Sequence, residues 1–235
     1  MNGKSLKKIL RVASEPFLHL FYPLLCLHCQ EELAAAGPLF CPGCLEHLSL
    51  IETKGRCRTC FAELSKGRCD RCIRRKVVIH RQLAACEAMG PVHALIREIY
   101  QGRRDCIAAA ASLMAYQWLE QKMLLPEYLI PLPSSFWQKQ KIGLDISLCL
   151  AQEIGKIFSI PTLSILRRKF DRSHFLTTGE FCHLFKAKKA GVLCDRRVLL
   201  ISVEQSDSSF RLAGQELKAF FPAQIDALSF AAKME

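Results

Sequence analysis

Four Cys-x-x-Cys pairs constrain the fold of this chain more than any other feature of its sequence. They are Cys26-Leu-His-Cys29, Cys41-Pro-Gly-Cys44, Cys57-Arg-Thr-Cys60 and Cys69-Asp-Arg-Cys72. A Cys-x-x-Cys turn presents two thiolates to one ion, and two such turns complete the tetrahedral four-thiolate site that is typical of structural zinc. Eight ligands therefore predict two zinc ions. Because thiolates fill every position around each ion, we expect both sites to be structural.

The spacing alone leaves the pairing of the four turns open. In the simplest arrangement the first two pairs bind one ion and the last two bind the other, but a cross-braced arrangement fits the same spacers. A redox role is the main alternative to metal binding, and a redox motif is expected as a single pair at the start of a helix. Four neighbouring pairs therefore favour metal. The other five of the 13 cysteines are scattered along the chain: Cys86, Cys106, Cys149, Cys182 and Cys194.

The length and composition fit one ordinary domain with a small appendage. The chain has 235 residues, of which 50% are hydrophobic and 23% are charged, so it can bury a core and is not a disordered chain. The same composition excludes a coiled coil, a collagen-like chain and a knottin-like scaffold. We predict a helical lead-in over 1–22, a double zinc ribbon over 23–80 and a larger domain over 81–235.

The N-terminal segment is basic and partly apolar. A short amphipathic helix kinked at Pro16 is expected there, packed on the body of the protein. The alternative is weak membrane-surface contact through residues 5–25. No run reaches the roughly 18 apolar residues that cross a bilayer, so no transmembrane segment is predicted. A signal-peptide cleavage site is also missing, and we therefore expect a reducing cytoplasm, where clustered cysteines bind metal more often than they form disulfides.

Basic residues are concentrated in and after the last two Cys-x-x-Cys pairs. Lys and Arg total 33 against 22 Asp and Glu, a net charge of +11, and ten of the basic residues lie from Lys54 to Arg81. Such a surface binds phosphate backbones by releasing counterions, with strong salt dependence and little sequence preference. A solvated charged surface is the alternative, and a single aromatic residue, Phe61, does not indicate base stacking. The candidate nucleic-acid contacts are Arg56, Arg58, Arg68, Arg71, Arg74, Arg75 and Lys76.

The remainder of the chain alternates predicted helices with predicted strands. Helices are predicted over 92–100, 104–123, 146–158 and 209–220, and buried strands over 128–132, 198–203 and 225–232, with a Pro-rich loop after the first strand. This alternation indicates an α/β domain with a largely parallel sheet flanked by helices. In such sheets, ligands bind beyond the carboxyl ends of the strands. The candidate ligand site therefore lies at Pro131–Gly143 and Ser202–Phe210.

The order of these segments resembles the ComF family, also described as GntX-like proteins. The resemblance covers nearly the whole chain and rests on the Cys-x-x-Cys pairs after Phe21-Tyr-Pro23, on Ile130-Pro-Leu-Pro133 and on Val198-Leu-Leu-Ile201. It implies a zinc ribbon followed by a type I phosphoribosyltransferase domain, and a link to natural competence, in which incoming single-stranded DNA is handled. It also implies a pyrophosphate loop, whose equivalents here are Pro131, Pro133, Lys141 and Gly143.

The chain departs from the family at the motif that holds phosphoribosyl pyrophosphate. The family strand ends in two acids that bind the ribose, followed by a Thr-Thr-Gly loop that wraps the phosphate. In this chain Ser202 and Val203 replace the acids, Asp207 stands where a Thr faces phosphate, and Ser208 replaces the glycine. A carboxylate there repels phosphate, and a non-glycine residue is costly where a positive φ is required. The degenerate loop consists of Ser202, Val203, Glu204, Ser206, Asp207, Ser208 and Ser209.

These substitutions predict a non-catalytic, zinc-binding scaffold that resembles competence and DNA-uptake factors. Its candidate partners are single-stranded DNA and competence or DNA-processing proteins. The alternative is an active phosphoribosyltransferase with a rearranged loop, in which Glu204 acts as a displaced acid and Mg²⁺ bridges the pyrophosphate. Mg²⁺ is expected only under that alternative.

Overall fold

The computed structural model divides the chain into two compact units, Met1–Leu48 and Ser49–Glu235. This division falls between the second and third Cys-x-x-Cys pairs, and the boundaries at 22–23 and 80–81 stay predictions from the sequence. The described residues are 24–34, 37–48, 50–64, 69–73, 77–168, 185–188 and 191–232. Outside them lie the predicted lead-in over 1–22, the side chain of Arg71, and Arg68, Arg74, Arg75 and Lys76.

In the first unit, helix α2 (Pro42–Glu46) directly follows Cys41. Pro42 occupies its first turn, where a missing N–H costs no helical hydrogen bond. The N–H of Leu27 donates to the carbonyl of Leu39 at 3.1 Å. This bond joins the segment that carries the first cysteine pair to the segment that leads into α2.

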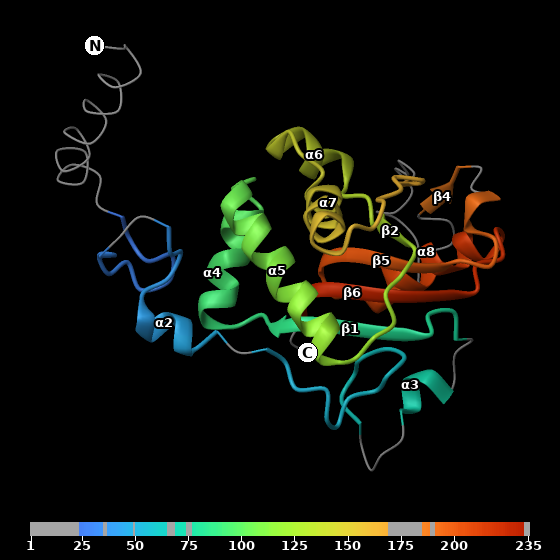
Figure 1. Cartoon of the computed structure of the whole chain (residues 1–235), viewed down its shortest axis with the longest axis horizontal. Coiled ribbons are helices and arrows are strands. Elements are labelled where there is room, and N and C mark those ends of the chain that lie inside the picture. The colour runs from blue at the N-terminus through green and yellow to red at the C-terminus, as the bar shows by residue number, and fades with distance from the viewer. Residues whose placement is uncertain are drawn as a thin grey trace, which may run out of the picture. The chain divides into compact units, whose positions relative to one another are not determined.

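A parallel sheet forms the centre of the second unit (Figure 1). Its described strands lie in the order β1-β6-β5-β2, and every neighbouring pair is parallel. They are β1 (Arg81–Glu87), β2 (Tyr128–Pro131), β5 (Arg197–Glu204) and β6 (Gln224–Ala232). A separate antiparallel pair consists of β3 (Leu166–Arg168) and β4 (Phe185–Ala187). The central strands β5 and β6 are buried on both faces, which explains their nearly continuous apolar sequences.

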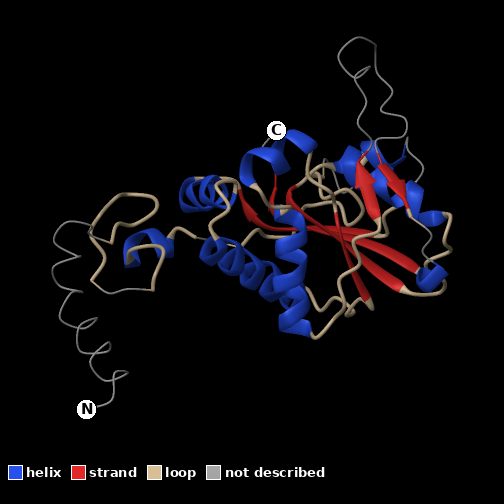
Figure 2. Cartoon of the chain, turned by 90° about the horizontal axis from the view of Figure 1, so that it is seen from above, coloured by secondary structure: helices blue, strands red, loops and turns tan. Residues whose placement is uncertain are grey.

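Helices cover both faces of this sheet (Figure 2). They are α4 (Gly90–Ile99), α5 (Arg104–Glu120), α6 (Phe136–Ile142), α7 (Ile146–Phe158) and α8 (Asp207–Lys218), with short pieces at α3 (Asp70–Ile73) and η2 (Gly191–Leu193). Helix α5 contacts β1 and β6, and α7 contacts β2 and β5. On the other face, Phe210 and Leu217 of α8 share a core with Leu200 of β5. The predicted α/β class, a parallel sheet flanked by helices after a Cys-rich segment, is confirmed.

The segment before the third Cys-x-x-Cys pair extends the sheet beyond β1. The N–H of Ile51 donates to the carbonyl of Ala85 at 2.9 Å, and Leu50 forms an antiparallel bridge with Cys86. The side-chain amide of Gln117 on α5 donates to the carbonyl of Ile51 at 2.9 Å. The chain that leads into the second cysteine group is therefore hydrogen-bonded to both the sheet and α5.

The predicted elements occur near their predicted positions, but the sequence does not predict the short strands β3 and β4, and helix α4 begins two residues earlier than predicted. Strand β1 is not among the predicted strands, because its Ala-Ala centre has low β propensity. Helix α6 occupies part of 131–143, where the sequence indicates a loop, and the Ser135 hydroxyl caps it by accepting from the N–H of Gln138 at 3.3 Å. Helix α8 begins two residues earlier than predicted, since the Ser206 hydroxyl accepts from the N–H of Ser209 at 3.3 Å.

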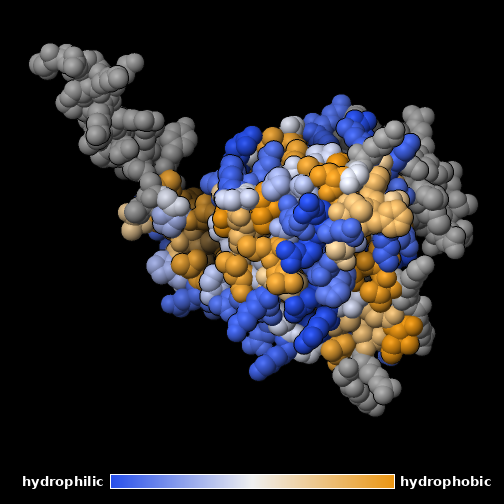
Figure 3. All heavy atoms as spheres, turned by 45° about the vertical axis from the view of Figure 1, so that its right-hand side comes forward, coloured by the Kyte–Doolittle hydropathy of each residue, from blue (hydrophilic) through white to orange (hydrophobic). Residues whose placement is uncertain are grey.

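The surface mixes polar and apolar residues. On the face shown in Figure 3, hydrophilic residues interrupt the hydrophobic ones. Exposed large apolar side chains are spread over several elements, for example Tyr116 on α5, Ile157 on α7 and Phe221 after α8. Scattered exposure of this kind is usual. Every helix in the described part of the chain is too short or too polar to cross a membrane.

Candidate functional site

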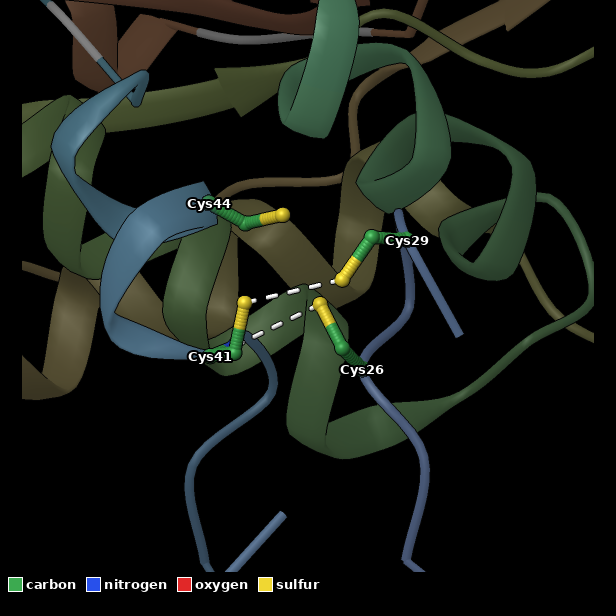
Figure 4. Close-up of side chains that lie close together, drawn as sticks. All are labelled: Cys26, Cys29, Cys41 and Cys44. Atoms are coloured by element: carbon green, nitrogen blue, oxygen red, sulfur yellow. Dashed lines mark hydrogen bonds between the residues drawn. The ribbon is translucent and has the colours of Figure 1, made fainter. Parts of the chain in front are cut away.

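The first four cysteines converge on one point in the first unit (Figure 4). Their four sulfurs lie within 4.8 Å of one another. The sulfurs of Cys29 and Cys41, one from each pair, are 3.5 Å apart. Four sulfurs bound at about 2.3 Å to a tetrahedral zinc ion lie roughly 3.8 Å apart, so this spacing fits such an ion. The members of this first group are Cys26, Cys29, Cys41 and Cys44.

The last four cysteines form a second group within the second unit. The sulfurs of Cys57 and Cys72 are 3.8 Å apart, and those of Cys60 and Cys69 are 3.4 Å apart. The pairing in the structure is therefore sequential, with one group for the first two turns and one for the last two. The cross-braced arrangement, which the spacing left open, does not occur.

Backbone N–H groups stabilise one thiolate in each group. Burial disfavours the Cys26 thiolate, but N–H groups, first that of Cys41, donate to its sulfur and lower its pKa to about 6. Burial also disfavours the Cys57 thiolate, but N–H donors, first that of Cys60, outweigh burial and lower the pKa of Cys57 to about 7. Burial and the neighbouring cysteines raise the pKa of Cys44 to about 12. A dication that binds all four sulfurs neutralises their mutual repulsion, so the donor set fits a metal ion.

Two residues outside the predicted ligand set also reach these groups. The Nδ1 atom of His28 lies 3.3 Å from the sulfur of Cys44. The side-chain amide of Gln205, which directly follows β5, donates to the carbonyl of Cys60 at 3.1 Å. The position of His28 inside a Cys-x-x-Cys turn could have indicated its contact. No sequence pattern indicates the Gln205 contact, because 145 residues separate the partners.

A second candidate site lies beyond the carboxyl ends of β2 and β5. It is a cavity of about 110 Å³, and both segments that the sequence predicts for a ligand site contribute to it. Its described lining consists of Tyr100, Leu132, Pro133, Ser134, Gln138, Ser147, Arg168, Phe185, Ser202, Val203, Ser206 and Ser209. Small-molecule sites usually have volumes of roughly 300 to 1,000 Å³, so this cavity is small for a ligand.

The degenerate loop is divided between this cavity and the surface. Val203 lines the cavity and is 4% exposed, at the position where the resemblance implies an acid. Glu204 and Ser208 are exposed and lie outside the lining, and the side chain of Asp207 is outside the described residues. Phe210, a residue of α8, is fully buried in the core that this helix shares with β5. The segment therefore forms the end of β5 and the first turn of a helix.

The predicted pyrophosphate-loop equivalents are also separated. Pro131 ends β2, and Pro133 lines the cavity. Lys141 and Gly143 lie at the end of α6, outside the lining, and Gly143 takes the positive φ of 74° that ends the helix. Among the described lining residues, the basic side chain is Arg168 of β3.

Glu204 has a partner in Tyr100, which follows α4. Burial raises the pKa of the Tyr100 phenol, and the negative charge of the neighbouring Glu204 carboxylate raises it further. Tyr100 lines the cavity, whereas Glu204 does not. The carboxylate that could have replaced the missing acids therefore lies outside the lining, beside Tyr100.

Comparison with known proteins gives limited matches. No family model matches the chain, and no curated protein does. One matching solved structure is glutamine phosphoribosylpyrophosphate amidotransferase from B. subtilis complexed with ADP and GMP, with 14% identity and a TM-score of 0.39 over 57% of this chain and 30% of that one. Another is hypoxanthine-guanine phosphoribosyl transferase from L. donovani, with 14% identity and a TM-score of 0.30 over 56% of this chain and 67% of that one. The chain spans less than a third of the length of the amidotransferase.

Proposed function

We propose that this protein is a ComF-type scaffold that binds two structural zinc ions and whose phosphoribosyltransferase-like domain has no transferase activity. The two four-cysteine groups, with their tetrahedral sulfur spacing, support the zinc sites. The 110 Å³ cavity carries the non-catalytic part of the proposal. In its described lining, Ser202 and Val203 stand where the resemblance implies two acids for the ribose hydroxyls.

The charges around this cavity also disfavour phosphoribosyl pyrophosphate. Phosphate groups need cations and free N–H donors. Arg168 is the basic residue of the described lining, and the Glu204 carboxylate lies nearby beside Tyr100. At the first turn of α8, the Ser206 hydroxyl already accepts from the N–H of Ser209. The site therefore offers a polyanion little compensation for the water it would lose.

We place the proposed binding of single-stranded DNA on the second cysteine group and the chain around it. Lys54 and Arg58 are exposed there, and contacts of such cations with phosphates release counterions. Arg56 differs, because it pairs with Glu87 at 3.1 Å and Glu63 at 3.5 Å. The proposal includes a cytoplasmic location, which the clustered cysteines support, and a competence or DNA-processing partner, which the sequence resemblance supports.

Isothermal titration with phosphoribosyl pyrophosphate in the presence of Mg²⁺ tests the non-catalytic part. We expect no heat beyond that of a control titration with Mg²⁺ alone. Micromolar binding would overturn this part and favour an active phosphoribosyltransferase with a rearranged loop.

Fluorescence anisotropy with a labelled single-stranded oligonucleotide tests the DNA part. We expect binding that weakens steeply as NaCl rises and that depends little on base sequence. An oligonucleotide that stays unbound at low salt would refute this part. Elemental analysis of the reduced protein should find two zinc ions per chain.

A further inference from the structure

A second cavity lies at the start of β1, next to the second cysteine group. Its volume is about 280 Å³, close to the roughly 300 Å³ at which small-molecule sites begin. Phe61, Leu83 and Met123 contribute apolar walls, and each is at most 9% exposed. All of its lining residues belong to the second unit. It is separate from the cavity beyond β2 and β5.

Three cations of this cavity have no acidic partner among the residues that the structure describes. They are Lys54, Arg58 and Arg81, and none of them forms an ion pair with any residue that the structure describes. Unpaired cations around one cavity attract an anion, because the opposing charge offsets their mutual repulsion. The cavity therefore suits a ligand that carries phosphate.

A fourth cation, Arg56, is held in a fixed position. Its guanidinium donates to Glu87 at 3.1 Å and Glu63 at 3.5 Å, and its Cζ atom lies 5.4 Å from the centre of the Phe61 ring. Because its charge is already paired, Arg56 contributes less to phosphate binding than its neighbours. A guanidinium plane held in this way is a surface on which a nucleic-acid base can stack.

Gln82 provides an independent sign of a ligand. It lines the cavity from β1 and is 2% exposed, and neither the Nε2 nor the Oε1 atom of its side chain has a hydrogen-bond partner among the described residues. Buried amides are nearly always paired, since an unpaired one loses its hydrogen bonds to water without replacement. An amide with a free donor and a free acceptor matches the edge of adenine, which offers a donor at N6 beside an acceptor at N7.

We propose that this cavity binds a nucleotide, with the phosphate at Lys54, Arg58 and Arg81, the base on the Arg56 guanidinium, and the base edge at Gln82. The nucleotide is either free or one unit of a single strand. In the second case the inference deepens the proposed DNA binding and rests on it.

Titration with AMP, ribose 5-phosphate and a 5′-phosphorylated oligo(dA) tests the proposal. AMP should bind more tightly than ribose 5-phosphate, which lacks the base. Gln82→Leu should weaken AMP binding about tenfold or more. The melting temperature of this variant should stay the same or rise, because the substitution removes an unpaired buried amide. Arg56→Lys keeps the charge but loses the stacking plane, so it should weaken AMP more than ribose 5-phosphate. Lys156→Ala, an exposed charge on α7, is the matched control.

The results separate this site from the proposed function. Binding of AMP without binding of oligo(dA) would support a site for free nucleotides and refute the DNA proposal. Binding of oligo(dA) that Gln82→Leu and Arg56→Lys leave unchanged would refute this site and keep the DNA proposal. If neither AMP nor oligo(dA) binds at low salt, both are wrong.

Discussion

The side-chain amide of Gln205 donates to the backbone carbonyl of Cys60 at 3.1 Å and so joins the end of β5 to the second cysteine group. The N–H of Gln205 donates to the carbonyl of Ala231 on β6 at 2.8 Å. One residue therefore fixes both the strand end and the cysteine turn. With the bond from Gln117 to Ile51, it makes the second cysteine group part of the sheet unit.

Gln205→Ala tests this link. The substitution leaves the Cys60 carbonyl without its side-chain donor, so we expect the free energy of unfolding to fall by about 1 kcal/mol. Urea denaturation followed by circular dichroism measures the change. Gln215→Ala, at an exposed glutamine of α8, is the control and should change stability by less than roughly 0.5 kcal/mol. Equal losses in the two variants would contradict a specific role for Gln205.

The two cysteine groups are expected to differ in what their loss does to the sheet. Cys60→Ser and Cys29→Ser should each reduce bound zinc from two ions to one, as measured by elemental analysis. Cys60→Ser should also lower the melting temperature of the sheet unit, because its group lies in that unit and is hydrogen-bonded to Gln205. Cys29→Ser should leave that transition unchanged, since its group belongs to the other unit. An equal fall in the melting temperature of the sheet unit in both variants would contradict the expected difference between the two cysteine groups.

Gly155 on α7 allows a close approach of the backbone that follows the helix. A Cβ atom added there would lie 2.7 Å from the carbonyl oxygen of Ile160, which cannot move freely. Gly155→Ala should therefore cost about 1 to 3 kcal/mol of stability, minus a gain of up to about 1 kcal/mol from helix propensity. At Gly191 an added Cβ meets no atom within 4 Å, so Gly191→Ala is the matched variant. Thermal melting compares the two, and a Gly155→Ala protein as stable as the wild type would argue against the contact.

Asp226 on β6 should make stability depend on pH. Burial raises the pKa of its carboxyl, and a hydrogen bond from Gln224 together with the neighbouring His80 imidazole offsets part of this rise. A raised pKa means that the folded state binds its proton more tightly than the unfolded state. The stabilisation by this group is therefore complete below the ordinary aspartate pKa and is lost as the pH rises through the folded value.

Asp226→Asn removes this titration. The variant should be more stable than the wild type at pH 7.5 and should lose much of that advantage near pH 4. Denaturation at the two pH values measures the difference, with Asp195→Asn, at an exposed aspartate after η2, as the control. An Asp226→Asn protein less stable than the wild type at both values would mean that the carboxylate form is favourable.

Much of the fold follows from local patterns in the sequence. The apolar run at Val198–Val203 predicts β5, and the helical spacing from Ile146 to Phe158 predicts α7. Strand β1 could not be found in this way, because its strand conformation depends on pairing with β6 on one side and with the Leu50 segment on the other. Such pairing partners lie far away in the sequence, so tertiary contacts decide the structure of this strand.

For the candidate sites, too, the sequence predicts some features, whereas tertiary contacts decide others. The cysteine spacing predicts the eight thiol ligands, but the sequential pairing depends on distances such as the 3.4 Å between the sulfurs of Cys60 and Cys69. Gln82 could not be singled out from the sequence, because nothing in the pattern marks a glutamine whose amide is buried without a partner. The loop residues Ser202 and Val203 are predicted to replace two acids, yet the sequence does not show that Phe185, from a distant segment, lines the same cavity.

The pairing of Leu50 and Ile51 with β1 has a consequence for solubility. An edge strand with free N–H and carbonyl groups is a template for strands of other chains, and proteins usually cover or charge such edges. Here the cover is the segment that leads into the second cysteine group. A chain whose second cysteine group came apart would therefore uncover one side of its sheet, and we expect self-association along β1 to accompany the loss of stability.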